Sequence, residues 1–285
     1  MKTNKQTKNK DAKEEYCNIC KQYSQLTRDH IPPKGCVKPT SLDLITLNQY
    51  LTKSNEKATI SQNGLWKLSI CKNCNNSLLG RNYDPKLIEF SNQVANLLRA
   101  QKVGLYLPEQ IKLNVNLQPL IRAVIGHVLA SSKPTPGQPP APGLLPDALR
   151  NYFLNTSSAI SDKIEIYYWI YPSKQQKVMN GFCIVSAIRE KEVMCTSLLK
   201  FFPLAFWIVW DRPPSFEINY QKISNEKLSG LDENCEILLN LRNFPPLNYP
   251  EVLDLDDKYF IMYNNELTVF AQPRNQKDLD KENKP

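Results

Sequence analysis

The stretch CNICKQYSQLTRDHIPPK, residues 17–34, joins a Cys-x-x-Cys pair to one of only two histidines in the chain. A second pair follows in ICKNCNN, residues 70–76. Two such pairs on one chain can supply four thiolates to a tetrahedral zinc ion. We therefore expect a structural Zn²⁺ site that joins two distant segments. Its four ligands are Cys17, Cys20, Cys71 and Cys74.

The excess positive charge lies entirely in the part of the chain that carries these motifs. Residues 1–110 contain 17 Lys and Arg against 9 Asp and Glu, whereas residues 111–285 contain 19 of each. A basic region joined to a neutral one indicates a polyanionic partner for the first, most often nucleic acid. We expect DNA rather than RNA, and no membrane partner.

The composition is that of a soluble globular protein of one large or two ordinary domains, with 41% hydrophobic and 22% charged residues. The first 15 residues hold lysines but no apolar stretch of the kind that a signal peptide has. The apolar run at 201–210 is too short to span a bilayer as a helix and contains Pro203. We expect a cytoplasmic protein whose reduced cysteines are available to a metal.

The first of two expected regions is the zinc region, residues 15–105, which follows a polar tail, residues 1–14. Apolar residues at helical spacing predict a helix over 85–101, with Asp84 as its cap and Pro85 in its first turn. Gly80 is expected to interrupt any helix that begins directly after Cys74. The helix over 85–101 should pack on the metal region and end it.

The second region, residues 111–273, is predicted to be an α+β domain with a mainly antiparallel sheet, followed by a charged tail, residues 274–285. Helices are expected over 117–131 and 144–155, with an exposed Pro-rich loop between them. Four β-branched and aromatic runs, beginning near residues 163, 181, 192 and 204, predict strands. Residues 259–272 predict a hairpin that turns at Asn264 and Asn265.

Between the two cysteine pairs lies Asp29-His30, and directly after the second pair lies Asn75-Asn76. In this order the motifs resemble the HNH nucleases of the ββα-metal class, and most closely the branch with DH-x-P and a final C-x-x-C-N-N. The resemblance covers roughly residues 15–85. It implies an N-terminal, zinc-stapled ββα-metal module and a metal-dependent endonuclease that hydrolyses phosphodiester bonds.

The resemblance also implies a role for each residue of the motif. His30 would be the general base, and Asp29 a ligand of a catalytic Mg²⁺ or Mn²⁺. Asn75 would be the second ligand, with Asn76 as its rival, and Asn63 would orient the loop that holds the base. Histidine, aspartate and asparagine suit phosphodiester hydrolysis, because a neutral imidazole accepts a proton from water near pH 7 and hard oxygen donors suit Mg²⁺.

Neighbouring side chains of a strand point to opposite faces, so Asp29 and His30 can serve one phosphate only if a bend or bulge redirects one of them. The Pro32-Pro33 pair favours such a break. Basic residues near the motif are expected to contact phosphates. They are Lys34, Lys38, Lys67, Lys72 and Arg81.

Several other residues are read as structural. Cys183, Cys195 and Cys235 are expected to be core or incidental residues without a metal spacing, and only Cys36 is close enough to join the metal region. His127 lies in a helical pattern without a metal spacing, and we interpret it as a packing or surface residue. The aromatic run 166–171 indicates a buried strand more than a base-stacking surface.

Three functions remain open from the sequence. The first is an HNH-type endonuclease, with a role in defence against foreign DNA or in a mobile element. The second is a zinc-stapled nucleic-acid-binding protein without catalytic activity. The third is an interaction protein in which the zinc module braces the α+β domain. Target recognition, formation of homo-oligomers and control of the nuclease are the roles expected for the second region.

Overall fold

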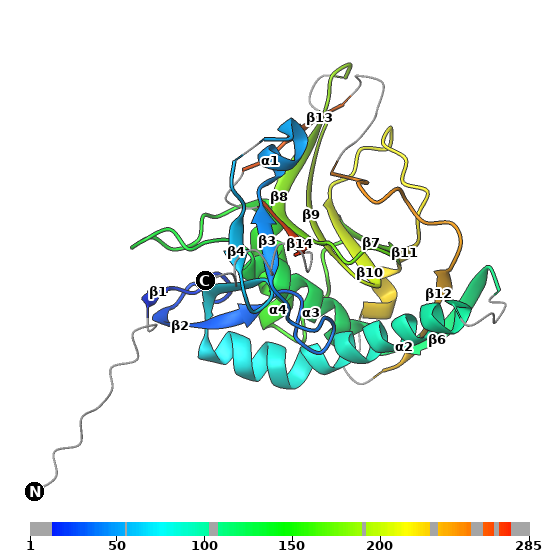
Figure 1. Cartoon of the computed structure of the whole chain (residues 1–285), viewed down its shortest axis with the longest axis horizontal. Helices are drawn as coiled ribbons and strands as arrows, with labels where there is room; N and C mark the ends of the chain where they lie inside the picture. The colour runs from blue at the N-terminus through cyan, green and yellow to red at the C-terminus, as the bar shows by residue number, and fades with distance from the viewer. Residues whose placement is uncertain are drawn as a thin grey trace, which may run out of the picture.

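The computed structural model describes residues 13–54, 56–102, 108–189, 192–228, 233–251, 259–264 and 268–274 (Figure 1). Nearly all of both expected tails lies outside the described residues, as does Asn265 of the expected hairpin turn. Within the described residues, no helix is long and apolar enough to span a membrane. The fold combines helices with antiparallel sheets, as the sequence predicts.

A small antiparallel sheet carries the first motif. Its strands are β1 (Glu14–Tyr16), β2 (Tyr23–His30) and β5 (Trp66–Cys71), with β2 in the centre. Directly after β5 the chain enters η1 (Asn73–Tyr83), a segment with π-helical turns, and continues into α2 (Asp84–Lys102). The motif residues therefore lie in the turn between β1 and β2, on the paired strands β2 and β5, and on the helical segment that follows β5.

Two local expectations about this helix are wrong. Gly80 does not interrupt it, because the helical path runs from Asn73 to Lys102. A glycine inside a helix costs only about 1 kcal/mol relative to alanine, which the packing of a long helix can offset. Asp84 also does not cap a new helix, since its backbone is already in the right-handed helical region and its carboxylate binds another residue.

The large sheet has nine strands. Eight follow in the order β11-β7-β10-β9-β8-β14-β3-β4, and β13 pairs with β8. Its strands are β3 (Leu42–Ile45), β4 (Thr59–Ser61), β7 (Ile164–Ile170), β8 (Gln176–Ser186), β9 (Val193–Phe201), β10 (Leu204–Trp210), β11 (Lys222–Ile223), β13 (Tyr259–Met262) and β14 (Thr268–Pro273). The four strands expected from β-branched and aromatic runs are confirmed as β7 to β10. The run 166–171 is buried, as expected.

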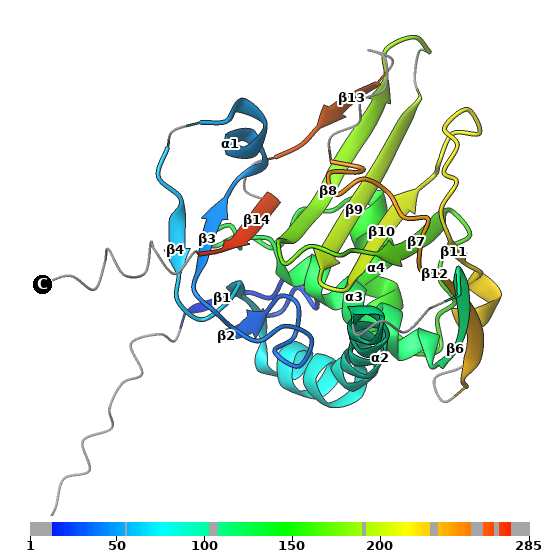
Figure 2. The same ribbon diagram turned by 45° about the vertical axis from the view of Figure 1, so that its right-hand side comes forward.

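The hairpin expected over 259–272 is wrong. Neither β13 nor β14 pairs with the other. Instead β13 pairs with residues 183–186 of β8 and β14 with residues 176–179. The two strands therefore lie one after the other along β8 (Figure 2). The long strand β8 offers each of them a partner, and this long-range pairing replaces the local turn.

Helices lie between the large sheet and α2 (Figure 1). They are α3 (Leu117–Ala130) and α4 (Leu144–Leu154), both expected from the sequence. Every residue of α3 is buried, as is typical of a helix that packs on all sides. Smaller elements complete the fold. They are α1 (Leu47–Thr52), β6 (Gln110–Val115), the 3₁₀ helix η2 (Asn225–Leu228) and β12 (Cys235–Asn240), which pairs with β6.

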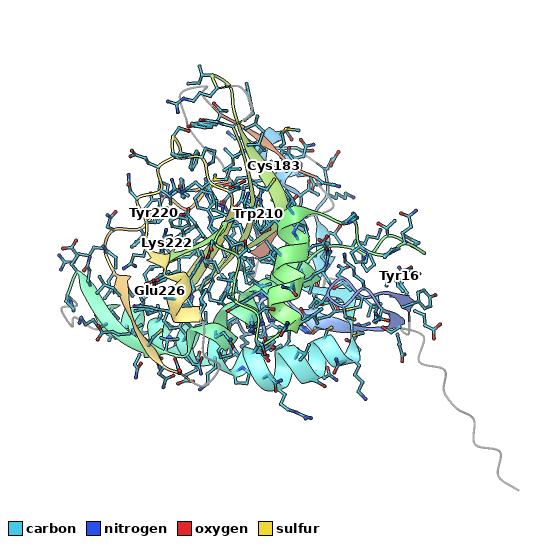
Figure 3. All side chains as sticks on the ribbon, turned by 180° about the vertical axis from the view of Figure 1, so that it is seen from behind. Tyr16, Cys183, Trp210, Tyr220, Lys222 and Glu226 are labelled. Atoms are coloured by element: carbon cyan, nitrogen blue, oxygen red, sulfur yellow. The ribbon has the colours of Figure 1, made fainter. Side chains whose placement is uncertain are left out.

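The boundary expected near residue 111 does not separate two packing units. Strands β3 and β4 belong to the first region of the sequence, yet β3 pairs with β14 at the C-terminal end of the second. One contiguous hydrophobic cluster also runs from Cys17 through α2 and α3 to Ile208 of β10. Figure 3 shows Tyr16 of β1 and Lys222 of β11 at opposite sides of this single body.

Two cysteines that the sequence treats as separate are neighbours. Cys183 of β8 and Cys195 of β9 are register partners, and their sulfur atoms lie 3.0 Å apart. The sequence gives no sign of this contact, because the register of two strands brings the thiols together and no local spacing reveals it. Cys235 remains apart, with its thiol against the carbonyl of Val115.

Candidate metal centre and catalytic site

The four cysteines of the two pairs converge on one point. One sulfur atom from each of Cys17, Cys20, Cys71 and Cys74 lies within 4.8 Å of the others. Zinc–sulfur bonds of about 2.3 Å place the sulfurs of a tetrahedral site roughly 3.8 Å apart. The Cys20 and Cys71 sulfurs lie 3.8 Å apart. The expected convergence is confirmed, and the group can hold a metal ion such as zinc. Cys36 does not belong to it.

A tight turn and backbone hydrogen bonds hold the four sulfur atoms close together. Lys21, directly after the first pair, has a positive φ of 59°, and its amide donates to the carbonyl of Cys17, which closes a tight turn. The amide of Cys71 donates to the sulfur of Cys17, and the amide of Cys74 donates to the sulfur of Cys71. Such N–H to sulfur bonds stabilise thiolates, which are the form that binds metal.

Contacts among the four thiols lower the pKa of two of them and raise the pKa of the other two. The hydrogen bond from Cys17 is the largest cause that lowers the pKa of Cys20, to about 7. Hydrogen bonds from the other three thiols also lower the pKa of Cys71. Hydrogen bonds within the cluster raise the pKa of Cys17 and the pKa of Cys74. The thiolate form is therefore favoured at Cys20 and Cys71 and disfavoured at Cys17 and Cys74, and a bound cation would favour it at all four.

His30 is the last residue of β2 and lies half-buried opposite Trp66 of β5. Its Nε2 lies 3.1 Å from the carbonyl oxygen of Asn63, in the loop before β5. A carbonyl only accepts, so Nε2 carries the proton and Nδ1 holds the lone pair. Burial and the charge of Lys34 lower the pKa of His30. The ring is thus a neutral imidazole whose orientation is set by Asn63.

Asn75 contacts the same strand from η1. Its Nδ2 donates to the hydroxyl of Thr27 at 3.0 Å and to the carbonyl of Arg28 at 2.9 Å. These bonds identify Nδ2 as the donor and leave Oδ1 as the side-chain acceptor. Asn76 is exposed and has no such contact with β2 among the described residues. Of the two rivals, Asn75 is therefore the residue held beside the strand that carries His30.

Asp29 is turned away from His30. Its side chain is only 4% exposed, and its Oδ2 lies 3.0 Å from Nδ1 of His127 on α3. On the other side of the same ring, Nε2 lies 2.9 Å from Oδ1 of Asp84. A β-bulge does occur in the ladder of β2 with β5, between Thr27 and Arg28, but it does not bring Asp29 and His30 to one face.

The buried group Asp29–His127–Asp84 carries charge. Both ring nitrogens face carboxylate oxygens, and both can donate only when the imidazole is protonated. Burial alone would lower the pKa of His127, but the two carboxylates overcome it and raise the value to about 10. Burial raises the pKa of Asp29, and the charge of His127 opposes that shift. The group therefore holds an imidazolium between two acidic side chains.

The sequence does not predict that His127 binds two buried carboxylates. His127 is a packing residue and not a surface one, and it joins β2 to the start of α2. Gly126 allows α3 to pack closely against α4 and η1, because a Cβ at this position would lie 2.5 Å from Phe153 and 2.6 Å from Leu79. The neighbouring pair Gly126-His127 is the local signal of a special contact, in a helix whose other polar side chains are Gln118 and Arg122.

The two carboxylates of this group do not form a metal site with His127. They approach opposite nitrogens of the ring, so their oxygen atoms do not converge on a common point. The four cysteines are the only group with metal-binding geometry among the residues that the structure describes. In this arrangement Asp29 offers a catalytic cation only Oδ1, the oxygen that His127 does not bind.

The basic residues named from the sequence lie at the surface. Lys34, Lys38, Lys72 and Arg81 are exposed, and Lys67 is half-buried, with its pKa lowered mainly by burial. Arg28 shares the outer face of β2 with His30, and its guanidinium lies 4.5 Å from the centre of the Trp66 ring. The surface around His30 therefore combines positive charge with an aromatic ring.

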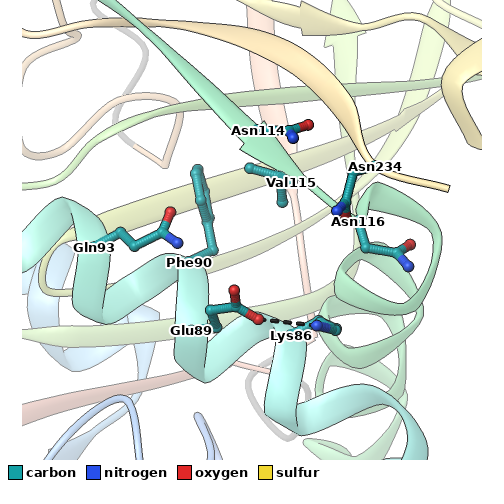
Figure 4. A pocket seen from close by; sticks show the side chains of 8 residues that line it. All are labelled: Lys86, Glu89, Phe90, Gln93, Asn114, Val115, Asn116 and Asn234. Atoms are coloured by element: carbon teal, nitrogen blue, oxygen red, sulfur yellow. Dashed lines mark hydrogen bonds and ion pairs between the residues drawn. The ribbon is translucent and has the colours of Figure 1, made fainter. Parts of the chain in front are cut away.

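A polar cleft between α2 and β6 is separate from these residues (Figure 4). Its lining includes Lys86, Glu89 and three asparagines, and Lys86 and Glu89 form an ion pair of 3.0 Å across one turn of α2. The accessible space is about 50 Å³, which suits a few water molecules. No candidate catalytic residue borders it.

Comparison with known proteins leaves the chain unassigned to a family. No protein-family model matches it, and searches of curated proteins and of solved structures found no match either. The class that the fold and the site define is therefore a mixed α and β protein with antiparallel sheets and a four-cysteine group able to bind a metal such as zinc.

Proposed function

We propose that this protein is an endonuclease of HNH type, which hydrolyses phosphodiester bonds of nucleic acid, and that its four-cysteine group binds zinc. The observation that carries the proposal is the state of His30. His30 is a neutral imidazole, half-buried at the end of β2. Its Nε2 binds a carbonyl, and its Nδ1 remains to accept a proton. That is the form a general base needs at neutral pH.

In this proposal His30 accepts a proton from the attacking water through Nδ1. Asn63 holds the ring through its carbonyl, and the zinc group holds β2 against β5 and η1 by joining their ends. Exposed lysines around the strand bind the phosphates on either side of the cut. DNA is the substrate that we propose before RNA, and defence against foreign DNA is the role we propose.

The catalytic Mg²⁺ or Mn²⁺ is also a proposal. The side-chain oxygen of Asn75 and the Oδ1 of Asp29 are the donors that would hold it, and the ion would stabilise the charge that develops on the phosphate. Asn75 suits this role, since its amide nitrogen is bound to β2 and its oxygen is the remaining acceptor. Asp29 suits it less well, because it is buried and bound to His127.

The inward position of Asp29 favours the second candidate function, a zinc-stapled nucleic-acid-binding protein without catalytic activity. One experiment separates the two. Supercoiled plasmid is incubated with the full chain and with His30→Ala, in Mg²⁺ and in Mn²⁺, with the zinc content and thermal unfolding of both measured. The endonuclease is supported if only the wild-type chain nicks the plasmid while both retain zinc. It is rejected if both fold, bind DNA and leave the plasmid intact in both metals.

A further inference from the structure

A cavity of about 320 Å³ lies where the two regions of the chain meet. Its walls come from the segment after the His30 motif, from α2, and from the loops and strands at one end of the large sheet. The lining residues are Cys36, Val37, Lys38, Thr40, Arg99, Lys174, Gln176, Phe202 and Pro273. The cavity therefore has three cationic side chains and no carboxylate.

The three cations are available to a ligand. Lys38, Arg99 and Lys174 are all exposed, and each comes from a different part of the chain. Arg99 donates to the neutral side chain of Asn96. None of the three forms an ion pair with a carboxylate in the part of the chain that the structure describes. Three like charges around one hollow raise the local concentration of anions.

The cavity is linked to the surroundings of His30. The carbonyl of Thr40, in the cavity wall, accepts a hydrogen bond of 2.8 Å from the amide of Gly64. Gly64 follows Asn63, whose carbonyl binds the imidazole of His30. A Cβ at Gly64 would lie 3.4 Å from Pro39 and 3.8 Å from the His30 ring. The wall that bears Lys38 is therefore held against the loop that orients the candidate base.

We propose that this cavity binds the phosphodiester backbone of the nucleic acid whose cut site lies at His30. Arg99 and Lys174 contact phosphates that Lys38 alone does not reach, so the second region of the chain takes part in holding the substrate. The location of the cut rests on the proposed function, whereas backbone binding in the cavity does not require that the chain cuts. Contacts to phosphates give affinity without sequence preference.

Binding is measured by fluorescence anisotropy, with labelled single-stranded and double-stranded DNA and RNA, over a series of salt concentrations. All proteins carry His30→Ala, so that cleavage does not disturb the titration. The test variants are Arg99→Gln, Lys174→Gln and the two combined. Lys112→Gln is the matched control, since Lys112 is an exposed lysine of β6 that pairs with Glu236. Thermal unfolding shows that each variant retains its fold.

Each test substitution removes about one phosphate contact, so the slope of log K against log salt falls by about 0.9 for duplex and about 0.7 for single strands. At 0.1 M salt the affinity falls by roughly fivefold to tenfold for each cation removed, and Lys112→Gln has no such effect. The inference is overturned if all three test variants keep the slope and affinity of their parent on all four nucleic acids.

The same substitutions in the chain with His30 intact separate this inference from the proposed function. If the chain nicks plasmid, the combined variant should raise KM and leave kcat unchanged. If the chain does not nick plasmid but the salt slope still falls, the endonuclease fails and the phosphate-binding cavity stands. If the chain nicks plasmid and the slope is unchanged, the endonuclease stands and the cavity has no part in binding.

Discussion

His127 Nδ1 lies 3.0 Å from Asp29 Oδ2, although the two residues are 98 positions apart in the chain. With Asp84 on the second ring nitrogen, this contact joins β2, the start of α2, and α3 at one buried point. It explains how the strand that carries His30 is held on the helical layer. It also assigns the buried carboxylate of Asp29 a structural partner in addition to any role at a phosphate.

Replacing His127 with alanine should destabilise the protein by about 3–5 kcal/mol, because it leaves two buried acidic groups without their shared cation. Urea unfolding followed by circular dichroism measures the change. Asp29→Asn combined with His127→Ala should lose less than the sum of the two single changes, since the residues act as a pair. Additive losses would show that the contact contributes nothing to stability.

The same group predicts a pH dependence. The pKa of His127 is raised to about 10 in the folded chain by Asp29 and Asp84, against an unfolded value near 6.5. Its charged form therefore stabilises the fold fully below about pH 6.5, and this contribution is lost as the pH rises through about 10. Unfolding free energies of wild type and His127→Gln, compared from pH 6 to pH 10, should converge toward the alkaline end. A constant difference across this range would contradict the assignment.

The four-cysteine group predicts that the stability of the fold depends on bound zinc. The purified chain should contain about one zinc ion, and Cys74→Ala should contain none and unfold at a markedly lower temperature, because a structural zinc contributes directly to folding. Elemental analysis and thermal unfolding provide the two readings. Cys235→Ala is the matched control, since Cys235 lies outside the group. Equal zinc content in both variants would exclude the four-cysteine site.

Asn75 and Asn76 offer a matched pair for the proposed activity. Asn75→Ala removes the two hydrogen bonds to β2 and should lower plasmid nicking by about 10- to 100-fold, as is typical of residues that position a reacting group or metal ligand. Asn76→Ala should leave nicking unchanged, because Asn76 is exposed and separate from β2. Initial rates at saturating Mg²⁺ distinguish the two. The reverse order of effects would make Asn76 the functional residue.

A second buried ionic group lies within the large sheet. Lys177 and Lys200 are register partners on β8 and β9, and both bind the carboxylate of Glu251, at 2.6 Å and 2.8 Å. All three side chains are fully buried. Glu251→Gln leaves two like charges in the core and should cost about 3–5 kcal/mol in urea unfolding.

An exposed ion pair supplies the control for that measurement. Glu236→Gln removes the partner of Lys112 at the surface and should change the free energy of unfolding by at most about 1 kcal/mol. Similar losses for Glu251→Gln and Glu236→Gln would mean that the buried lysines relax to solvent or lose their protons. Burial lowers the pKa of Lys200 to about 8, so the comparison is made at pH 7.

Local patterns were sufficient for much of the fold. Repeated Cys-x-x-Cys spacing identified the four sulfurs that converge, and β-branched runs located the strands β7 to β10. Helical spacing located α2, α3 and α4. In each case the signal lies within a few residues, where chain geometry alone sets which side chains share a face or a turn. The order of Asp29-His30 and Asn75 also indicated the residues now found on β2 and beside it.

Long-range contacts account for what those patterns missed. The partner of Asp29 is on α3, β14 lies between β8 and β3, and Cys183 meets Cys195 through the register of two strands. None of these pairings follows from spacing, because each depends on how separate elements pack into one shared core. Two buried carboxylates require a cation, and the close helix packing at Gly126 brings His127 to meet that requirement. The sequence alone therefore does not indicate that His127, among the basic residues of the chain, is the partner of these carboxylates.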